Sequence, residues 1–579
     1  MEKKWVLAPM IDDSFRQQFP EMDPVVLQLL WNRNLRTQKD IDIFLGPDWG
    51  RDTFSCGLFR QMPAAVARVF TALQNNEVIT VHGDYDADGV CGSAILVSTL
   101  RDLARAVGVD PLKITAYIPH REKEGYGLSV ATAEHLKSHE KTALIITVDC
   151  GISNKEAIAR AKELGIDTII CDHHTIPKEL PTTAIIIHPL IEGEIYPNKS
   201  LCGTGVAFKL ACALFTEARR RGLPFSEGYE KWLIDLVAIA TVTDVMSVIG
   251  ENRVLLQYGL LVMNKTKRVG LQKLIEISGA KSGELDTFSI AFQIGPRINA
   301  AGRMNHANQA LHLLLEEDPA RAVELAAALQ EINVSRQKAS ELMYYEAKEQ
   351  IGEVAGRGLL VAHDEGWPAG LVGLVAGKLV TDFHRPVLII GQDGDHYVGS
   401  GRSIEGFNIM GVLQAAAPYL DRFGGHPQAC GFSIVGQENF INAVMAMSAY
   451  VQNELSSELL VSRVKVDTEI TLEEVNWKLH HALEEFAPFG ADNPRPLFLS
   501  SGLVVKGMDT VGVDGKHLRL TVASPRGTIW KMIGFKLGEW RERIRLGDFV
   551  DVVYEIGENE WRGNLQLQLK IIDLRKSKV

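Results

Sequence analysis

The feature of this sequence that most constrains its fold is a series of short, apolar runs, rich in β-branched residues, between residues 60 and 250. The five runs are Glu77–Val81, Lys113–Ile118, Ala143–Val148, Thr168–Cys171 and Ala184–Ile187. Segments with helical periodicity, such as Ala94–Val107 and Asn154–Leu164, lie between several of them. Near-continuous apolar strands joined by helices are typical of a parallel sheet that is covered on both faces. The sequence therefore predicts an α/β domain with a parallel sheet.

Acidic residues and histidines follow these runs at the points where the runs end. They are His82, Asp84, Asp86 and Asp88 after the first run, Asp149 after the third, and Asp172, His173 and His174 after the fourth. A further apolar stretch, Leu233–Ala240, leads to Asp244. In an open parallel sheet, ligands bind at the carboxyl ends of the strands, where the loops leave a crevice. We therefore expect these side chains to meet at one edge of the sheet.

So much negative charge in one place requires a positive partner, because neighbouring carboxylates repel one another and raise one another's pKa. That partner could be a cluster of lysines or arginines, a phosphate ligand with its own cations, or bound metal. A single aspartate at a strand end more often caps a helix or a turn. Four clusters at one edge, two of them with histidine, favour metal. Carboxylate with imidazole suits Mn²⁺ or Mg²⁺ better than a structural zinc, and the number of ligands favours a pair of ions.

The spacing of these residues resembles that of the DHH phosphoesterase superfamily. The resemblance rests on His82-x-x-x-Asp86-x-Asp88, Asp149, Asp172-His173-His174 and Asp244. It implies a dinuclear Mn²⁺ or Mg²⁺ centre in which Asp149 bridges the ions. One ion would be held by Asp86, with His82 or a water.

The same resemblance implies roles for the remaining residues of these motifs. Asp88, His173 and Asp244 would hold the second ion. Three further residues would orient ligands or handle protons, either as direct metal ligands or through contact with a ligand. They are Asp84, Asp172 and His174.

Changes in pattern along the chain predict its division into domains. Residues 1–55 are expected to form a short helical segment, and residues 56–305 the catalytic domain with the parallel sheet. Residues 306–352 have helical periodicity and predict one or two connecting helices. Residues 353–455 predict a second α/β domain, which would bind substrate. In residues 456–579 short alternating strands predict a small all-β barrel, for which an OB-fold is the leading interpretation.

Five further motifs narrow the resemblance to the RecJ exonucleases of that superfamily, over essentially the whole chain. They are Pro119–Gly127, Gly295–Arg303, Gly366–Gly373, Gly399–Ser403 and Gly424–Ala429. Glycine-rich turns let backbone amides approach phosphate oxygens, and hydroxyl and guanidinium groups add further donors. The candidate substrate-binding residues in these motifs are Arg121, Arg297, Arg303, Ser400, Arg402, Gly425 and His426. For Arg297, a solvated surface position is an equally good interpretation.

The resemblance implies an enzyme that hydrolyses single-stranded DNA from the 5′ end to mononucleotides, in DNA repair and recombination. Ser400 and Arg402, with Arg121, would hold the 5′-terminal phosphate. Arg303 would offset charge that builds on the non-bridging oxygens. His426 would position substrate or assist the leaving 3′ oxygen.

The barrel would add a second contact with the strand. Its first expected strand is Val464–Asp467. An OB-fold groove binds single strands by backbone charge and base stacking. The candidate contacts are Lys506, Lys516, His517, Arg519, Lys531 and Arg541, interleaved with Trp530 and Phe535. The two aromatic residues could equally belong to the barrel core.

The net charge of −11 argues against a protein that coats nucleic acid by bulk electrostatics, but it leaves room for an enzyme with a local basic groove. No apolar stretch approaches the roughly 18 residues that a transmembrane helix needs. The seven cysteines contain no C-x-x-C pair, which favours the reducing cytoplasm. We expect a cytoplasmic monomer. The resemblance adds single-stranded DNA with a 5′ end, and a single-strand-binding protein, as partners.

Two other functions remain open at this point. One is a phosphodiesterase of the same superfamily for short oligonucleotides or cyclic dinucleotides, which has no need of the chain beyond about residue 450. The other is a non-catalytic scaffold at the replication fork. Such scaffolds typically lose the aspartates, whereas all the proposed ligands are present here.

Overall fold

The computed structural model describes residues 3–561 and 563–577. The chain forms two compact units. The large unit contains residues 52–247 and 251–460, and the small unit contains residues 1–51, 248–250 and 461–579. Among the described residues, none of the helices combines the length and the apolar character that a membrane crossing requires.

Five parallel strands form the first sheet of the large unit, in the order β3-β2-β4-β5-β6. The strands are β2 (Val78–Gly83), β3 (Ile114–Tyr117), β4 (Thr142–Val148), β5 (Asp167–Cys171) and β6 (Ile185–Ile187). Ile145 and Ile170 pack on one face with helices α7 (Val130–His135) and α8 (Lys155–Glu163). Leu144 and Ile169 are equally buried and face the other side, because side chains alternate along a strand. The predicted parallel α/β fold is confirmed.

Two long helices, α6 (Ala87–Ala106) and α9 (Gly203–Arg220), also contact this sheet. The other helices of the domain are α5 (Met62–Gln74), α10 (Ile234–Thr243), α11 (Glu251–Met263), α12 (Val269–Ser278) and α13 (Gly295–Met304). The apolar stretch Leu233–Ala240 is therefore no strand, and Asp244 follows a helix rather than a sheet edge. The stretch belongs to α10, which is buried almost all round, so its sequence lacks the polar positions that reveal a helix.

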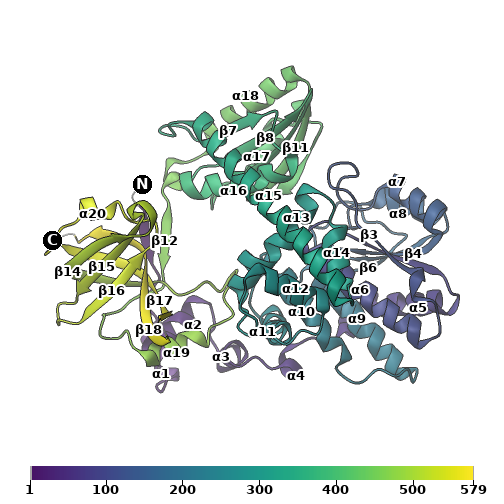
Figure 1. Ribbon diagram of the computed structural model, residues 1–579, viewed down its shortest axis with the longest axis horizontal. Coiled ribbons are helices and arrows are strands. Elements are labelled where there is room, and N and C mark those ends of the chain that lie inside the picture. The colour runs from purple at the N-terminus through teal and green to yellow at the C-terminus, as the bar shows by residue number, and fades with distance from the viewer. Residues whose placement is uncertain (1–2, 562, 578–579) are drawn as a thin grey trace. The chain divides into compact units, whose positions relative to one another are not determined.

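Helices α14 (Asn308–Leu315) and α15 (Pro319–Ile351) follow this domain. Helix α15 contacts α12 and α13 and, further along, α16 and β7, as Figure 1 shows in teal. The second sheet has the order β10-β11-β9-β8-β7, with only β7 and β8 parallel. Its strands are β7 (Leu360–Asp364), β8 (Val387–Asp393), β9 (His396–Arg402), β10 (Arg422–His426) and β11 (Ala429–Val435), and its helices are α16 (Ala369–Phe383), α17 (Ile409–Ala415) and α18 (Gln437–Glu454).

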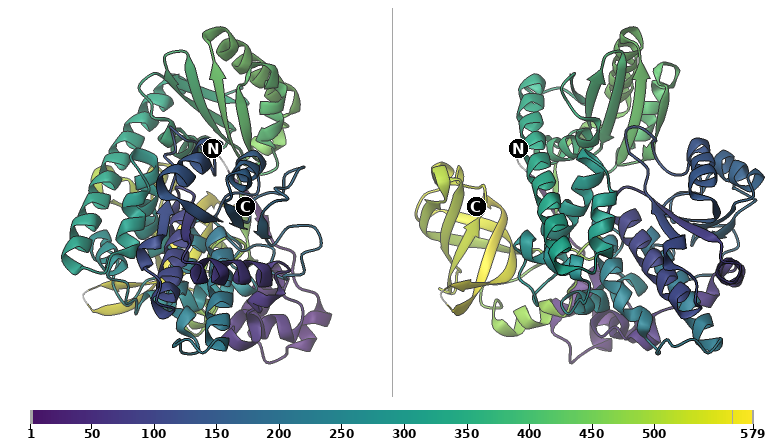
Figure 2. Two further views of the ribbon diagram at one scale, coloured as in Figure 1. Left: turned by 90° about the vertical axis from the view of Figure 1, so that its right-hand side faces the viewer. Right: turned by 45° about the vertical axis from the view of Figure 1, so that its right-hand side comes forward.

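The small unit contains a closed barrel of five strands, shown in yellow in Figure 2. They are β14 (Phe498–Val511), β15 (His517–Ala523), β16 (Ile529–Gly534), β17 (Phe549–Trp561) and β18 (Asn564–Lys576), and β14 pairs with β17 to close the barrel. The expected first barrel strand, Val464–Asp467, instead appears as β12 (Arg463–Val466) and pairs with β1 (Lys4–Leu7). The short strand β13 (Thr468–Glu469) extends the barrel sheet beside β14.

The N-terminal helices belong to the same core as the barrel. Helices α2 (Pro24–Asn32) and α3 (Gln38–Leu45) bury Leu29, Leu30 and Phe44 against barrel residues and against α19 (Trp477–Glu484). The small unit also contains the short helices α1 (Asp13–Gln18) and α20 (Trp540–Arg543), and α4 (Trp49–Asp52) spans the boundary of the units. The two ends of the chain thus fold as one unit.

Candidate active site

Two helix N-termini fix the first acidic motif. Asp86 is the N-cap of α6, and its carboxylate accepts hydrogen bonds from the Asp88 and Gly89 amides at 2.9 and 3.1 Å. The Asp88 carboxylate in turn accepts bonds of 2.7 Å from both the Gly203 and the Thr204 amide at the start of α9. Helix N-termini favour negative charge, because their amides lack partners within the helix. Asp86 therefore has both the capping and the site role that its sequence position allowed.

Asp149 is held in an unusual backbone conformation directly after β4. Its φ of 60° lies in the left-handed region, which aspartate adopts more readily than most residues. The Tyr126 hydroxyl donates to its carbonyl oxygen at 2.9 Å. Helix α9 passes so close that a Cβ on Gly203 would lie 2.6 Å from the Asp149 Cβ. Only glycine at position 203 leaves room for the Asp149 side chain in this place.

The Asp172 carboxylate is saturated with hydrogen bonds. It accepts from the backbone amides of Ile152, His173 and His174, and it lies 2.8 Å from Nδ1 of the His174 ring. Burial opposes ionisation of Asp172, but the hydrogen bond from His174 outweighs it and holds the pKa of this carboxyl below its usual value. In return, Asp172 overcomes the effect of burial on His174 and raises the pKa of the imidazole to about 9. Asp172 therefore acts by orienting His174.

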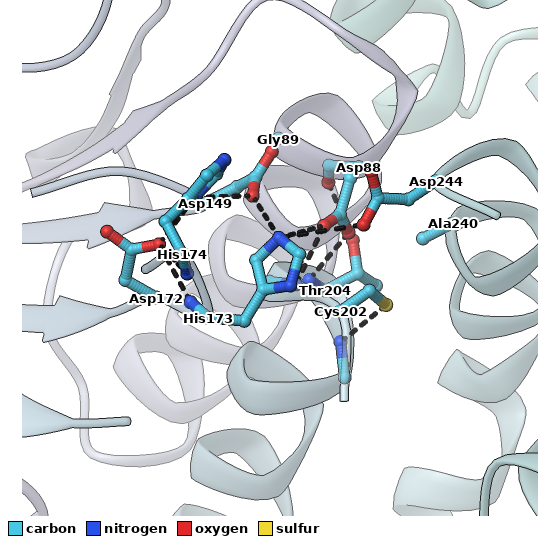
Figure 3. A network of polar contacts seen from close by, with 12 residues as sticks. Asp88, Gly89, Asp149, Asp172, His173, His174, Cys202, Thr204, Ala240 and Asp244 are labelled. Carbon is cyan, nitrogen blue, oxygen red and sulfur yellow. Dashed lines mark hydrogen bonds and ion pairs between the residues drawn. The ribbon is translucent and has the colours of Figure 1, made fainter. Parts of the chain in front are cut away.

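The acidic and histidine side chains of the site form three overlapping groups, and within each group the candidate ligand atoms lie within 4.8 Å of one another. The groups are Asp84 with Asp86 and Asp149, Asp88 with His173 and Asp244, and Asp149 with His173 and His174. Figure 3 shows His173 between Asp149 on one side and Asp88 with Asp244 on the other. Its Nε2 lies 3.1 Å from Asp149, 3.7 Å from Asp88 and 3.6 Å from Asp244. The structure thus brings these side chains together.

The electrostatics of the cluster fit a site for divalent cations. Burial first, and then repulsion among the carboxylates, raises the pKa of Asp84, Asp86 and Asp149 above the usual value, and that of Asp244 to about 8. Oδ1 of Asp84 is buried and has no hydrogen-bond partner among the residues that the structure describes. Buried carboxylates in this state require a neutralising partner. Carboxylate oxygen with imidazole nitrogen is a donor set that Mn²⁺ and Mg²⁺ accept.

His82 belongs to none of these three groups in the described chain. Its ring is fully buried, stacks against Tyr117 and places Nδ1 3.6 Å from the Cys150 sulfur. Burial lowers the pKa of His82 to about 4, so the ring is neutral. In the described part of the chain, Asp84 rather than His82 groups with Asp86 and Asp149.

A cavity of about 680 Å³ lies beside α13 and the second sheet, and it gathers four of the predicted substrate-binding residues. Its lining includes Arg121, Arg303, Ser400 and Arg402. Arg402 and Ser400 share one face of β9, where Nη1 of Arg402 donates to the Ser400 hydroxyl at 2.9 Å. Burial, and then the nearby charge of Arg121, lowers the pKa of Arg303 to about 10. Three guanidinium groups around one cavity form a site for an anion such as phosphate.

The other three predicted substrate-binding residues lie outside the lining of this cavity. The Arg297 guanidinium donates to Gln330, Gln293 and Ser278, and so joins α13 to neighbouring helices. Gly425 and His426 are exposed on β10. Cross-strand register aligns His426 with Ala429 and Ala429 with Arg402, so His426 lies two strands from Arg402 in the same row.

The predicted barrel contacts divide into exposed and half-buried side chains. Trp530 packs against the core and donates from its indole to the Leu472 carbonyl, whereas Phe535 is exposed beside His517. The basic side chains are exposed at Lys506, Lys516, Arg519, Lys531 and Arg541.

Three residues that sequence reasoning missed help to build the site. Asn299 on α13 accepts a bond of 2.7 Å from the Ala87 amide, next to Asp86. Tyr126 supports Asp149, and Gly203 lets α9 approach. Tyr126 stands between two glycines of a motif already singled out, and Gly203 opens a Gly-Thr-Gly helix start of the kind that approaches anions. Asn299 also stands in a motif already singled out, Gly295–Arg303, but its partner is 212 residues away in the chain, so the sequence did not indicate this contact.

Comparison with known proteins first identifies the class. Residues 78–241 match the model of the DHH family, N-terminal domain, and residues 356–453 match the DHHA1 domain. The first match covers the parallel sheet and all of the acidic cluster except Asp244, and the second covers the domain of the second sheet. Residues 466–573 match the RecJ OB domain, which covers the barrel.

The particular family follows from relatives that match nearly the whole chain. The single-stranded-DNA-specific exonuclease RecJ of Bacillus subtilis (strain 168) is 36% identical over 553 residues, which are 95% of this chain and 68% of that protein. Crystal structures of RecJ from Thermus thermophilus in complex with Mn²⁺ and with Mg²⁺ each cover 100% of this chain, with TM-scores of 0.83 and 0.78 and identities of 29% and 28%. The matched regions are 80% and 79% of the length of those two RecJ chains. The chain belongs to the RecJ family of exonucleases.

Proposed function

We propose that this protein is a metal-dependent exonuclease that hydrolyses single-stranded DNA from its 5′ end and releases mononucleotides. The observation that carries the proposal is one compact unit with two chemically matched sites. It contains a carboxylate and imidazole cluster suited to two divalent cations, and a cavity with three arginines suited to phosphate. The RecJ relatives are named as exonucleases specific for single-stranded DNA, which supports the same substrate here.

Each cation would have its own set of protein ligands. Asp84, Asp86 and Asp149 would hold one, and Asp88, His173 and Asp244 the other, with Asp149 between the two sets. Divalent cations bound in this way supply Lewis acidity and positive charge to phosphodiester hydrolysis.

The side chains of the cavity would set the position of the strand. Arg402 and Ser400, with Arg121, would bind the 5′-terminal phosphate, because their donors surround one cavity. Arg303 would hold a non-bridging oxygen of the scissile phosphate, since it faces the same cavity and its charge also acts on Asp86. A terminal phosphate fixed at this point would let the enzyme remove one nucleotide at a time from the 5′ end.

We also propose a setting for this activity. All seven cysteines are free, which supports the reducing cytoplasm. We propose a monomeric enzyme in DNA repair and recombination, which meets its strand together with a single-strand-binding protein.

Digestion of one single strand, labelled at either the 5′ or the 3′ end, tests the polarity. With Mn²⁺, the 5′ label should appear at once as a mononucleotide, while the 3′-labelled strand shortens gradually. EDTA should stop both reactions. Immediate release of the 3′ label as a mononucleotide would contradict the proposal, and preference for a dinucleotide over a long strand would favour the oligonucleotide phosphodiesterase instead.

The Arg402→Ala variant tests the phosphate site. Wild-type enzyme should prefer a 5′-phosphorylated strand over a 5′-hydroxyl strand, and the variant should lose most of that preference in kcat/KM. Arg422→Ala, which removes an exposed arginine of the same sheet, is the matched control and should keep it. An unchanged preference in Arg402→Ala would remove this residue from the phosphate site.

A further inference from the structure

Two phenylalanines with solvent-exposed rings lie on the helical run that carries Arg303. Phe288 and Phe292 are 59% and 65% exposed, and their ring centroids are 4.8 Å apart at an interplanar angle of 38°. Large apolar side chains are stabilised by leaving water, so an adjacent pair of exposed rings indicates a surface that binds another group. None of the roles assigned above uses these rings.

The pair continues a row of residues that already belong to the site. The π-helical segment Ser289–Ile294 runs directly into α13. At helical spacing, Phe288, Phe292, Asn299 and Arg303 fall on one side of this run. Asn299 supports the amide next to Asp86, and Arg303 lines the anion cavity.

Between Phe292 and Asn299, the same helical run passes the end of the metal cluster that contains Asp244. A Cβ on Gly295 would lie 2.4 Å from the Thr243 side chain, and Thr243 directly precedes Asp244. Along the helix the order is therefore anion cavity, metal cluster, aromatic pair. Eleven residues separate Arg303 from Phe292, which is about 16 Å at the usual helical rise. A π-helical turn is rare and is frequent at functional sites.

We propose that Phe288 and Phe292 form a stacking platform for bases of the uncleaved strand, on the 3′ side of the scissile phosphate. This inference rests on the proposed function. A strand whose 5′ phosphate occupies the arginine cavity and whose next phosphate lies at the cluster continues away from Arg303. Exposed aromatic rings bind bases of any sequence, because every base offers a flat face. The platform would hold the remaining strand after each nucleotide is released.

Substrate length separates this role from the chemistry. A 5′-phosphorylated dinucleotide is too short to reach the platform, whereas a strand of 20 nucleotides covers it. The double variant Phe288→Ala/Phe292→Ala should cleave the dinucleotide with the wild-type kcat/KM. Its Kd for the long strand should rise by about thirtyfold or more, since two stacking contacts are lost and each costs roughly 1–3 kcal/mol. Phe288→Leu/Phe292→Leu keeps apolar bulk without an aromatic face and should recover little of the affinity.

The salt dependence and a control variant distinguish stacking from other contacts. The slope of log Kd against log salt should stay at the wild-type value, because the platform carries no charge. Tyr345→Ala removes a ring on α15 that is also 59% exposed. It should change neither the kcat/KM for the dinucleotide nor the Kd for the long strand. Equal loss on the dinucleotide and on the long strand would show that the rings only support the metal cluster, and so would overturn the proposal.

Strands with one abasic site locate the contact. In wild-type enzyme, an abasic site at the stacked nucleotides, a few positions from the 5′ end, should weaken binding, and in the double variant the same lesion should add nothing. Additive effects of lesion and variant at every position, or unchanged binding of the long strand by the variant, would contradict the platform. Failure of the wild-type enzyme to degrade any 5′-phosphorylated strand would instead contradict the proposed function.

Discussion

At the scale of single residues, the site is built from carboxylates that could not all stay ionised without help. Asp149 is the clearest case, because burial and the charges of Asp88, Asp86 and Asp84 all raise its pKa. A carboxyl whose folded pKa lies above its unfolded value binds more protons when folded, so it costs stability as the pH rises through that range. The cluster thus trades stability of the metal-free protein for cation binding.

Replacing Asp149 by asparagine should separate stability from activity. We expect Asp149→Asn to have lost nuclease activity and, in EDTA at neutral pH, to melt at a higher temperature than the wild type. Mn²⁺ should raise the melting temperature of the wild type and have little effect on the variant. Calorimetry with and without Mn²⁺ measures both effects. A variant with full nuclease activity would rule out the proposed role of Asp149.

The close approach of Gly203 to Asp149 makes a second prediction. Gly203→Ala should lower Mn²⁺ affinity and activity strongly, because the added Cβ would lie 2.6 Å from the Asp149 Cβ. Gly377→Ala in α16 is the matched control, since open space surrounds that position. It should be neutral or slightly stabilising, by up to about 1 kcal/mol. Metal titration and activity assays compare the two variants, and equal behaviour would argue against the tight fit.

The candidate site could be predicted from sequence where the chemistry is local. Asp86, Asp88, Asp149 and His173 stand beside strands or helices whose ends meet, so spacing and topology sufficed. The place of His82 depends on packing, because its ring stacks against Tyr117 and lies beside the Cys150 sulfur, and spacing alone carries no information on such contacts. Asn299 and Gly203 contact residues that are more than 50 positions away in the chain. A local sequence pattern does not show which distant residues come into contact.

At the scale of elements, each departure from the expected pattern has its own local cause. The stretch Leu233–Ala240 shows no helical periodicity, because nearly every side chain on helix α10 is buried. The stretch Gly424–Ala429 has the composition of a turn, but it forms the end of β10, a two-residue turn and the start of β11. There, a Cβ on Gly425 would lie 2.4 Å from the Ala429 carbonyl oxygen. Strand β12 pairs with the four-residue strand β1, too short to be recognised by alternation.

Helix α2 gives a prediction at this scale, because it completes the core of the barrel unit. Leu29 is fully buried in that core, so Leu29→Ala should destabilise the small unit by about 2–5 kcal/mol. Leu342→Ala on α15 is the control, since this leucine is 61% exposed. Urea denaturation followed by hydrogen exchange would locate the loss. Equal protection of the barrel amides in both variants would contradict a shared core.

At the scale of the whole molecule, the chain begins and ends in the same unit. The large unit contains both the acidic cluster and the arginine cavity, and the small unit contains the OB domain. The general α/β and barrel classes were predictable, because their sequence patterns differ. Apolar runs joined by helical segments indicate the α/β domains, and short alternating strands indicate the barrel. The joining of the N-terminal helices to the barrel was not, since the partners are more than 400 residues apart.

This division predicts different outcomes for two truncations. Removing only residues 461–579 should give an insoluble protein, because it bares the apolar face of α2 and α3. Removing residues 1–51 as well should restore solubility and leave metal-dependent cleavage of a dinucleotide, with weaker binding of long strands. Expression yield, size-exclusion chromatography and both cleavage assays check this. Full solubility of the first truncation would contradict it.

The proposed mechanism needs two cations at the acidic cluster, and anomalous diffraction from crystals of the enzyme grown with Mn²⁺ tests this directly. We expect two peaks about 3.5–4 Å apart. One should lie among Asp84, Asp86 and Asp149, and the other among Asp88, His173 and Asp244. A single fully occupied peak, or Mn²⁺ bound elsewhere while the crystallised enzyme degrades single-stranded DNA in solution, would contradict it.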